Sequence, residues 1–289
     1  SVIILVGVVS LFTKGLSSGV DFKGGWSYIV QLDQPVNTVD LKSEIGKYIK
    51  DNTEVKTYGM NNQYKITTAY RINDKGETLS DEVKGTVIKA LAKYNGSEKS
   101  ILSESKVGPT IANDTRNAST MAIILSLVGM FAYIVLRFRK VGFGLGATAA
   151  LFHDVLIVFS IYSILKGIVP FPLDIDQAFI AAILTVVGYS INDTVVVFDR
   201  VREFLGLHKH EKQTGVVINN SINATLSRTV VTSFTTLLVV LILFLFGGEG
   251  LKGFTFALLI GILVGTYSSV GIATPVVVDI EGEERKAKK

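Results

Sequence analysis

Long apolar runs alternate with short polar connections over the second half of the chain. A bilayer core of about 30 Å is crossed by about 20 helical residues, so an apolar run of 18 or more residues predicts a membrane-spanning helix. Five such runs lie at residues 119–136, 142–165, 177–198, 229–246 and 253–278. Residues 1–16 are also apolar, and we interpret them as a truncated first span. The pattern predicts a polytopic α-helical membrane protein with six transmembrane helices.

The polar stretch between the first two predicted spans has the periodicities of a small α+β domain. Trp26, Tyr28, Val30 and Leu32 alternate with polar residues, as the buried face of a strand does. Further alternation at 64–72, short strands near 54–59 and 100–107, and helical spacing at 41–49 and 83–94 complete the pattern. The order β-α-β-β-α-β predicts a ferredoxin-like fold.

These patterns divide the chain into four parts. We expect the truncated helix 1 at 1–16, the ferredoxin-like domain at 17–118, a five-helix transmembrane bundle at 119–280 and a basic tail at 281–289. The domain is thus inserted between helices 1 and 2.

Basic residues are concentrated in alternate connections, which explains the net charge of +4 without nucleic-acid binding. One set of connections carries Arg137, Arg139, Lys140, Arg200, Arg202, Lys209, Lys212, Arg285, Lys286, Lys288 and Lys289. The short loops on the other side carry only Lys166 and Lys252. Cytoplasmic loops of membrane proteins are enriched in Lys and Arg. We therefore expect both termini in the cytoplasm and residues 17–118 in the periplasm or outside the cell.

Two pairs of glycines recur at four-residue spacing within the predicted spans, Gly142 with Gly146 and Gly261 with Gly265. Small residues at this spacing let helix backbones approach closely. We interpret both pairs as helix-packing positions.

Asp193 lies inside the predicted span 177–198, five residues and roughly 7.5 Å from its cytoplasmic end. An ionised Asp at a membrane helix centre costs about 2.5–3.5 kcal/mol, so such residues tend to face the bundle interior and to be functional. Asp193 borders a face formed by Thr185, Tyr189, Asn192 and Val196. It is either a proton-exchanging group or an inert carboxylate locked to a neighbouring helix.

Arg228 is the second intramembrane candidate. It follows one predicted helix face with Ser221, Thr225, Thr232 and Thr236 at steps of three or four. Hydroxyl groups at this spacing can hold water or receive an ion pair, and a pair with Asp193 would explain both charges. Alternatively, an Arg at a helix entrance can extend to the lipid headgroups.

His153 and Asp154 lie near the middle of the span 142–165. A His titrates near neutral pH, so the pair could carry protons, or it could form an interhelical hydrogen bond. Asp174 and Asp176 resemble a solvated loop rather than a metal site, and Asp199 to Glu203 continue a helix into solvent.

The composition excludes several classes of chemistry. The chain has no cysteine, so disulfides, thiol catalysis and Cys-ligated metal are excluded. It also contains no Walker loop, no Ser-His-Asp arrangement and no His/Glu metal spacing. We expect no enzyme activity and no cofactor, with energy supplied by an ion gradient.

Four segments resemble the SecF family of bacterial protein export. They are GVDFKGG (19–25), LFHDVLI (151–157), VVGYSINDTVVVFDRVRE (186–203) and NATLSRTVVTSFTTLL (223–238). The resemblance implies half of a proton-driven transporter of the resistance-nodulation-division superfamily in the bacterial inner membrane. The implied partners are SecD, as a separate subunit or a fused half, the SecYEG translocon, YajC, YidC, membrane lipid and an unfolded preprotein.

The same resemblance assigns roles to two residues. The family's essential intramembrane carboxylate corresponds to Asp193 and its intramembrane arginine to Arg228. A further acidic residue belongs to the SecD half. Our hypothesis is that Asp193 alternates between a protonated state and an Arg228-paired state, which Asn192 and Thr232 help to hydrate or position.

Two alternatives stay open at this point. The first is a small-molecule or lipid exporter of the same superfamily, although the roughly 80 residues at 26–107 leave little room for a substrate pocket. The second is a non-transporting scaffold of the export channel, in which the buried charges are purely structural.

Overall fold

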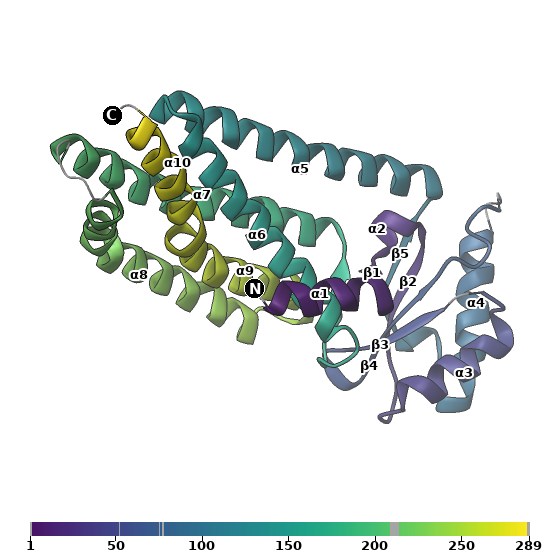
Figure 1. Cartoon of the computed structure of the whole chain (residues 1–289). Coiled ribbons are helices and arrows are strands. Elements are labelled where there is room, and N and C mark those ends of the chain that lie inside the picture. The colour runs from purple at the N-terminus through teal and green to yellow at the C-terminus, as the bar shows by residue number, and fades with distance from the viewer. Residues whose placement is uncertain (1, 52, 75, 77, 209–213, 288–289) are drawn as a thin grey trace.

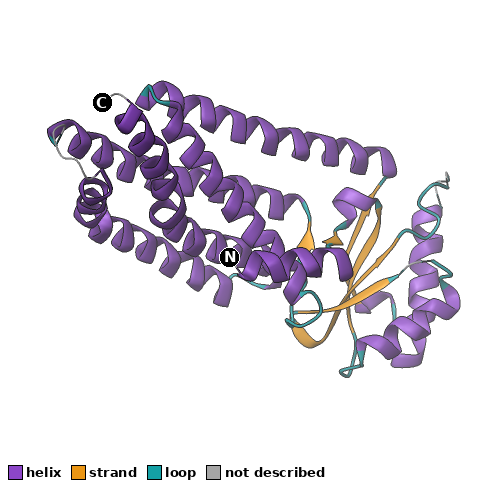
Figure 2. Cartoon of the chain, in the orientation of Figure 1, coloured by secondary structure: helices purple, strands orange, loops and turns teal. Residues whose placement is uncertain are grey.

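The computed structural model describes residues 2–51, 53–74, 76, 78–208 and 214–287. Four basic residues of the predicted cytoplasmic segments, Lys209, Lys212, Lys288 and Lys289, lie outside these residues. A bundle of long helices stands beside a smaller domain built on an antiparallel sheet (Figure 1; Figure 2). The two parts are joined through α1, α5 and the connection between α6 and α7.

The bundle consists of α5 (Pro109–Phe138), α6 (Val141–Leu165), α7 (Gln177–Leu207), α8 (Thr214–Phe246), α9 (Glu249–Ser268) and α10 (Thr274–Ala287). Within the described residues, five helical segments are long and apolar enough to cross a membrane, and they contain the five long apolar runs. The apolar residues near the N-terminus form α1 (Val2–Thr13), a shorter helix that packs against α6. The prediction of a helical membrane protein is confirmed.

Several helices extend past the apolar runs that predicted them. Helix α5 begins at Pro109, α7 continues to Leu207 and α8 begins at Thr214. Hydropathy marks the thickness of the hydrocarbon layer, whereas a helix ends only where capping or a turn stops it. The continuation of α7 through Asp199 and Glu203 agrees with the prediction.

The run 253–278 is not one regular helix. A π-helical turn at Ser269–Ala273 separates α9 from α10, and the Thr274 hydroxyl donates to the Ser269 carbonyl at 2.9 Å. Single π-helical turns inside α-helices occur frequently at functional sites. Hydropathy alone could not have indicated this interruption.

The sheet domain, residues 25–107, has the element order predicted from the sequence. It contains β2 (Gly25–Gln31), α3 (Thr38–Tyr48), β3 (Glu54–Tyr58), β4 (Met60–Thr68), α4 (Leu79–Leu91) and β5 (Ile101–Val107). The strands pair antiparallel in the order β3-β4-β2-β5. Trp26, Tyr28 and Val30 of β2 are fully buried beneath the helices, as their alternation predicts.

One strand boundary differs from the prediction. Alternation suggested a strand at 64–72, but β4 ends at Thr68 and the chain turns through 69–73. Arg71 has a left-handed φ of 52°, which ends the extended conformation. Tyr70 and Ile72 still pack against the core from this turn, and therefore keep the apolar pattern that misled the prediction.

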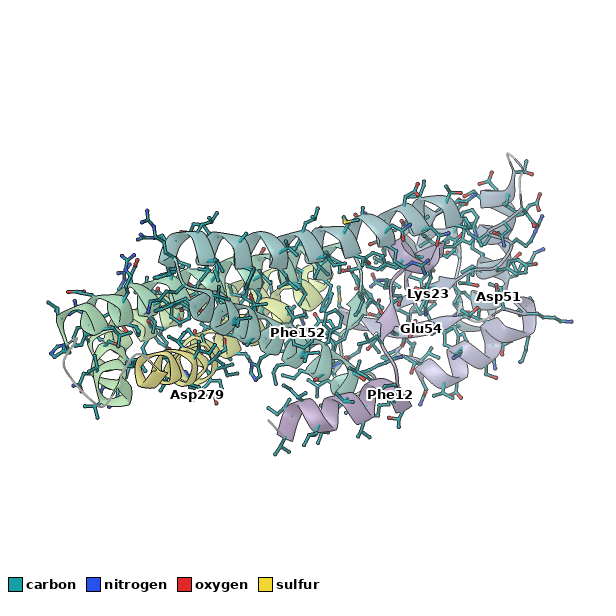
Figure 3. The ribbon with its side chains drawn as sticks, turned by 45° about the horizontal axis from the view of Figure 1, so that its top comes forward. Phe12, Lys23, Asp51, Glu54, Phe152 and Asp279 are labelled. Carbon is teal, nitrogen blue, oxygen red and sulfur yellow. The ribbon has the colours of Figure 1, made fainter. Side chains whose placement is uncertain are left out.

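The expectation of a solvated loop at Asp174 and Asp176 is wrong. Residues Asp174–Ile175 form β6, which pairs in parallel with β1 (Ser17–Ser18). Asp174 is buried and forms ion pairs with Lys56 and Lys65 of the sheet domain. Figure 3 places Glu54, a neighbour of Lys56, where the sheet domain meets the bundle, and Asp279 toward the bundle's opposite end.

The glycine pairs lie at close helix contacts, as predicted. A Cβ at Gly261 would lie 2.1 Å from Val186 of α7, and one at Gly146 would lie 2.6 Å from the carbonyl oxygen of Ala273. These glycines therefore allow α7 and α9, and α6 and the π-helical turn, to pack at close range.

We expect Gly146→Ala to destabilise the bundle by about 1–2 kcal/mol, because the added methyl would meet backbone that has no rotamer to change. The free energy of unfolding in lipid nanodiscs measures the effect. Gly188→Ala is the matched control, since a Cβ there meets nothing within 4 Å. Equal stability of the two variants would contradict this account of the packing.

Candidate functional site

Asp193 lies on the face of α7 that meets α8, and only 4% of it is exposed. Its carboxylate accepts a hydrogen bond from the Ser233 hydroxyl of α8 at 3.2 Å. The Tyr189 hydroxyl donates to Ser233 Oγ at 3.3 Å, and Thr266 Oγ1 of α9 lies 2.7 Å from the same atom. A short polar network thus connects the buried acid to three helices.

Helical periodicity explains how the network forms. Tyr189 and Asp193 are four residues apart on α7, so both side chains reach Ser233 from one face. On α8 the buried hydroxyl residues also recur every four positions, at Ser221, Thr225, Thr229 and Ser233.

The buried face of α8 differs from the one predicted. Thr232 is exposed, and its hydroxyl donates to carbonyl oxygens of its own helix, including that of Arg228 at 2.9 Å. Thr236 bonds in the same way to the Thr232 carbonyl. The predicted face shares Ser221 and Thr225 with the buried face and departs from it at Arg228. The buried face instead continues at four-residue spacing through Thr229 and Ser233, and this spacing is visible in the sequence.

Arg228 is exposed, and among the described residues it forms no ion pair with Asp193. Its charge is nevertheless close enough to act electrostatically on that carboxylate. Arg228 borders a cleft of about 540 Å³ at the end of the bundle away from the sheet domain. The other lining residues are Arg137, Val196, Asp199, Arg200, Arg202, Glu203, Ala224 and Thr225.

The predicted polar face of α7 is only partly covered. Tyr189 points into the network, whereas Thr185 and Asn192 are exposed on this chain. Asn192 therefore does not contact the Asp193 network. The cause is geometric, because Asn192 lies 100° around the helix from Asp193.

Buried Asp154 and partly buried His153 of α6 belong to a second cluster, next to the position of Phe152 in Figure 3. Asp154 Oδ2 accepts hydrogen bonds from Ser190 of α7 and Ser268 of α9, both at 2.7 Å. His153 Nδ1 lies 3.2 Å from Asp154 Oδ1. Asp154 thus forms interhelical hydrogen bonds, one of the two predicted alternatives for this pair, whereas the contact of His153 is with its neighbour on the same helix.

The two clusters are separate but adjacent along α7 and α9. Ser190 of α7 and Ser268 of α9 belong to the Asp154 cluster. Asp193 of α7 and Thr266 of α9 belong to the Ser233 network. In the part of the chain that the structure describes, no group of three or more His, Asp or Glu side chains could hold a metal. Both clusters consist of carboxylate and hydroxyl groups joined by hydrogen bonds, with an imidazole in the second.

Comparison with known proteins identifies the family. Residues 86–283 match the family described as protein export membrane protein SecD/SecF, C-terminal, and residues 9–36 match the SecD/SecF GG motif. The protein translocase subunit SecF of Rhodothermus marinus is 44% identical over 280 residues, which cover 96% of this chain and 88% of that protein. The chain belongs to the SecF family. A second SecF, from Thermodesulfovibrio yellowstonii, is 38% identical over the same shares of the two chains.

Solved SecDF structures share the fold. The crystal structure of SecDF from Thermus thermophilus, a translocon-associated membrane protein, is 31% identical with a TM-score of 0.83. It matches 97% of this SecF-family chain, which spans 36% of the SecDF chain. SecDF in its super-membrane-facing form matches 99% of this chain at 32% identity with a TM-score of 0.66.

Proposed function

We propose that this chain is the SecF component of a bacterial Sec export complex, in which proton movement through the membrane part drives handling of a preprotein emerging from SecYEG. SecD is the immediate partner, with YajC and YidC as further components. The family match and the relatives named protein translocase subunit SecF support this proposal.

The proposed arrangement has six spans in the inner membrane. Helix α1 is the first, and the sheet domain is a periplasmic ferredoxin-like domain between spans one and two. The connection between α5 and α6, the end of α7 and the C-terminal end of α10 lie together at the bundle end away from this domain (Figure 1). That end carries Arg137, Arg139, Lys140, Arg200 and Arg202, as cytoplasmic loops do.

The surroundings of Asp193 carry the proposal. A buried carboxylate with hydroxyl neighbours and a nearby cation, but no direct ion pair, can hold a proton in this arrangement, and the cation is close enough to pair with it once the proton leaves. Arg228 would approach when Asp193 is ionised and withdraw when it is protonated. The arrangement observed here supports the unpaired state of this cycle.

The energy available is sufficient for such a switch. Moving one charge through 100 mV is worth about 2.3 kcal/mol, which shifts a two-state equilibrium by about fiftyfold. Protonation would alter how α7 packs against α8 and α9, because the Ser233 network links all three helices.

The uncovered polar side chains of α7 would face the other half of the transporter. Thr185 and Asn192 lie exposed on a helix that is otherwise deep in the bundle. Polar residues in membrane helices normally face protein or water-filled cavities rather than lipid. A SecD half packed here would complete the proton site with its own acidic residue.

The proposal is tested by preprotein transport into inverted vesicles that contain SecYEG, SecD and this chain, with and without an imposed proton gradient. We expect the chain to increase transport mainly when the gradient is present. An equal increase without the gradient would favour a scaffold and contradict the proposal.

In the same assay, Arg228→Leu is expected to remove most of the gradient-dependent increase, because ionised Asp193 loses its counter-charge. Arg200→Leu serves as the control, since Arg200 borders the same cleft but pairs with Glu203. Full gradient dependence in Arg228→Leu would exclude Arg228 from the mechanism.

A further inference from the structure

The connection between α6 and α7 is bonded to the sheet domain by a buried ionic cluster. Asp174 Oδ2 lies 3.1 Å from Lys65 Nζ of β4, and Oδ1 contacts Lys56 Nζ of β3. The Ser17 hydroxyl of β1 donates to Oδ1 at 2.8 Å. Only 8% of the Asp174 side chain is exposed, and each lysine side chain is about one-fifth exposed.

The same connection leads directly into α7, the helix that carries Asp193. The Asp176 side chain caps α7 by accepting from the Phe179 amide at 2.8 Å. Asp21, in α2 (Val20–Lys23), accepts from the Gln177 amide at 3.2 Å. The first turn of α7 is therefore held by groups on both sides of the junction.

The SecD/SecF GG motif brings the sheet domain close to this turn. Gly24 and Gly25 have φ values of 73° and 143°, which disfavour any residue with a side chain. A Cβ at Gly25 would lie 2.7 Å from the Thr68 carbonyl oxygen, and one at Gly19 would lie 3.1 Å from Asp176 Cβ. These glycines let α2 fit between β4 and the start of α7.

We infer that Asp174, Lys56 and Lys65 form a latch that fixes the sheet domain to α7, so that a displacement of α7 is transmitted to the domain. Asp174 is then a coupling residue that acts at a distance from the proton site. The inference rests on the proposed function for its consequence in transport, but the latch itself is a property of this chain.

The charges of the latch persist at physiological pH. Burial opposes ionisation of Asp174, but the charges of Lys56 and Lys65 outweigh it and lower the pKa of this carboxyl to about 2. Because the folded pKa lies below the ordinary value of about 3.9, the stabilisation is complete above that value and is lost only as pH falls toward 2. The other charged groups close to these residues are Glu54, Asp176 and Asp21. The ion pairs of the latch are therefore fully charged near neutral pH.

Spin labels test the latch directly, because the chain has no cysteine of its own. Labels at Val39→Cys in α3 and Phe152→Cys in α6, both exposed positions, report the distance between domain and bundle in nanodiscs. We expect one narrow distribution for the otherwise unmodified chain. Asp174→Asn should broaden it, since losing a buried charge pair lowers the docked fraction relative to the undocked one by roughly tenfold or more.

Three further variants make the test specific. Lys56→Gln with Lys65→Gln should reproduce the broadening, and Lys65→Gln alone should give an intermediate result because Lys56 still pairs with Asp174. Asp33→Asn, an exposed carboxylate of the same domain, should change nothing. Fluorescence of Trp26, the sole tryptophan and fully buried in the domain, verifies that each variant is folded. A narrow, unshifted distribution in folded Asp174→Asn and in the double lysine variant would overturn the latch.

Transport then separates the latch from the proposed function. Asp174→Asn should lower the gradient-dependent part of preprotein transport roughly tenfold and leave the gradient-independent part intact. If Asp193→Asn removes gradient dependence but Asp174→Asn does not, the latch is wrong and the proposed function stands. If neither variant alters gradient dependence while Asp174→Asn still broadens the distances, the latch stands and proton coupling through this chain fails.

Discussion

Asp193→Asn is expected to abolish the gradient-dependent part of preprotein transport while the complex still assembles. Asn has nearly the same shape as Asp and can still accept the hydrogen bond from Ser233, so packing between α7 and α8 is retained. It cannot bind or release a proton. The coupling of about 2.3 kcal/mol per charge at 100 mV is therefore lost, and with it an equilibrium shift of about fiftyfold.

Two controls make the result specific to ionisation at this position. Asp193→Glu keeps a titratable group and should retain part of the gradient dependence. Asp199→Asn, on the same helix, removes a carboxylate that is more exposed and pairs with Arg137 and Arg202, so transport should change little. Full gradient dependence in Asp193→Asn would refute proton coupling through this residue.

Asp154→Ala is expected to lower the free energy of unfolding by about 2–3 kcal/mol, without a selective loss of gradient dependence. Its carboxylate links α6 to α7 and α9 through Ser190 and Ser268. Its removal leaves the Ser190 hydroxyl without this acceptor and leaves the Ser268 hydroxyl only the longer bond to the Gly265 carbonyl, at 3.2 Å. Interhelical hydrogen bonds in membranes contribute about 0.6–1.7 kcal/mol each, and the vacated space adds a cavity cost.

Ser160→Ala is the matched control on the same helix. Ser160 is also buried, but its hydroxyl has no hydrogen-bond partner in the described part of the chain, so its removal should be neutral. Unfolding of both variants in nanodiscs gives the comparison. If Asp154→Ala is as stable as Ser160→Ala but loses gradient dependence, Asp154 carries protons instead of fastening helices.

Much of the fold could be predicted because the hydrophobic pattern of each helix or strand shows which of its side chains are buried. The apolar runs of the bundle and the alternation of Trp26, Tyr28 and Val30 depend only on which side chains leave water. Helix ends were harder, since α5 and α8 extend into polar sequence that continues to favour helix. The π-helical turn after Ser268 has no hydropathic signal at all.

The candidate site could be predicted only in part, because it depends on how neighbouring helices are rotated. Asp193 was identifiable from the cost of burying a charge. Its hydrogen-bond donor, Ser233, lies outside the predicted face of α8, because that face was defined by Arg228 and Thr232. On α8 the buried face is marked by the unbroken four-residue repeat of small hydroxyl residues and not by the position of the charged residue.

The surroundings of Asp174 could not be predicted because its partners are far away in the sequence. An acid beside prolines in a short loop gives no sign that Lys56 and Lys65, more than 100 residues earlier, will surround it. The parallel pairing of β1 with β6 places Ser17 opposite Asp174, and Lys56 contacts both residues. Thr185 and Asn192 show the complementary case, in which polar residues lie exposed because the surface proposed to cover them belongs to another half of the complex.

Infrared difference spectroscopy of Asp193 in the assembled, active complex is the most direct measurement. We predict that the band of a protonated carboxyl group appears and disappears as the buffer changes from acidic to alkaline, and that Asp193→Asn removes this band. A carboxyl group that keeps one protonation state throughout, in complexes whose transport still responds to the proton gradient, would contradict the account.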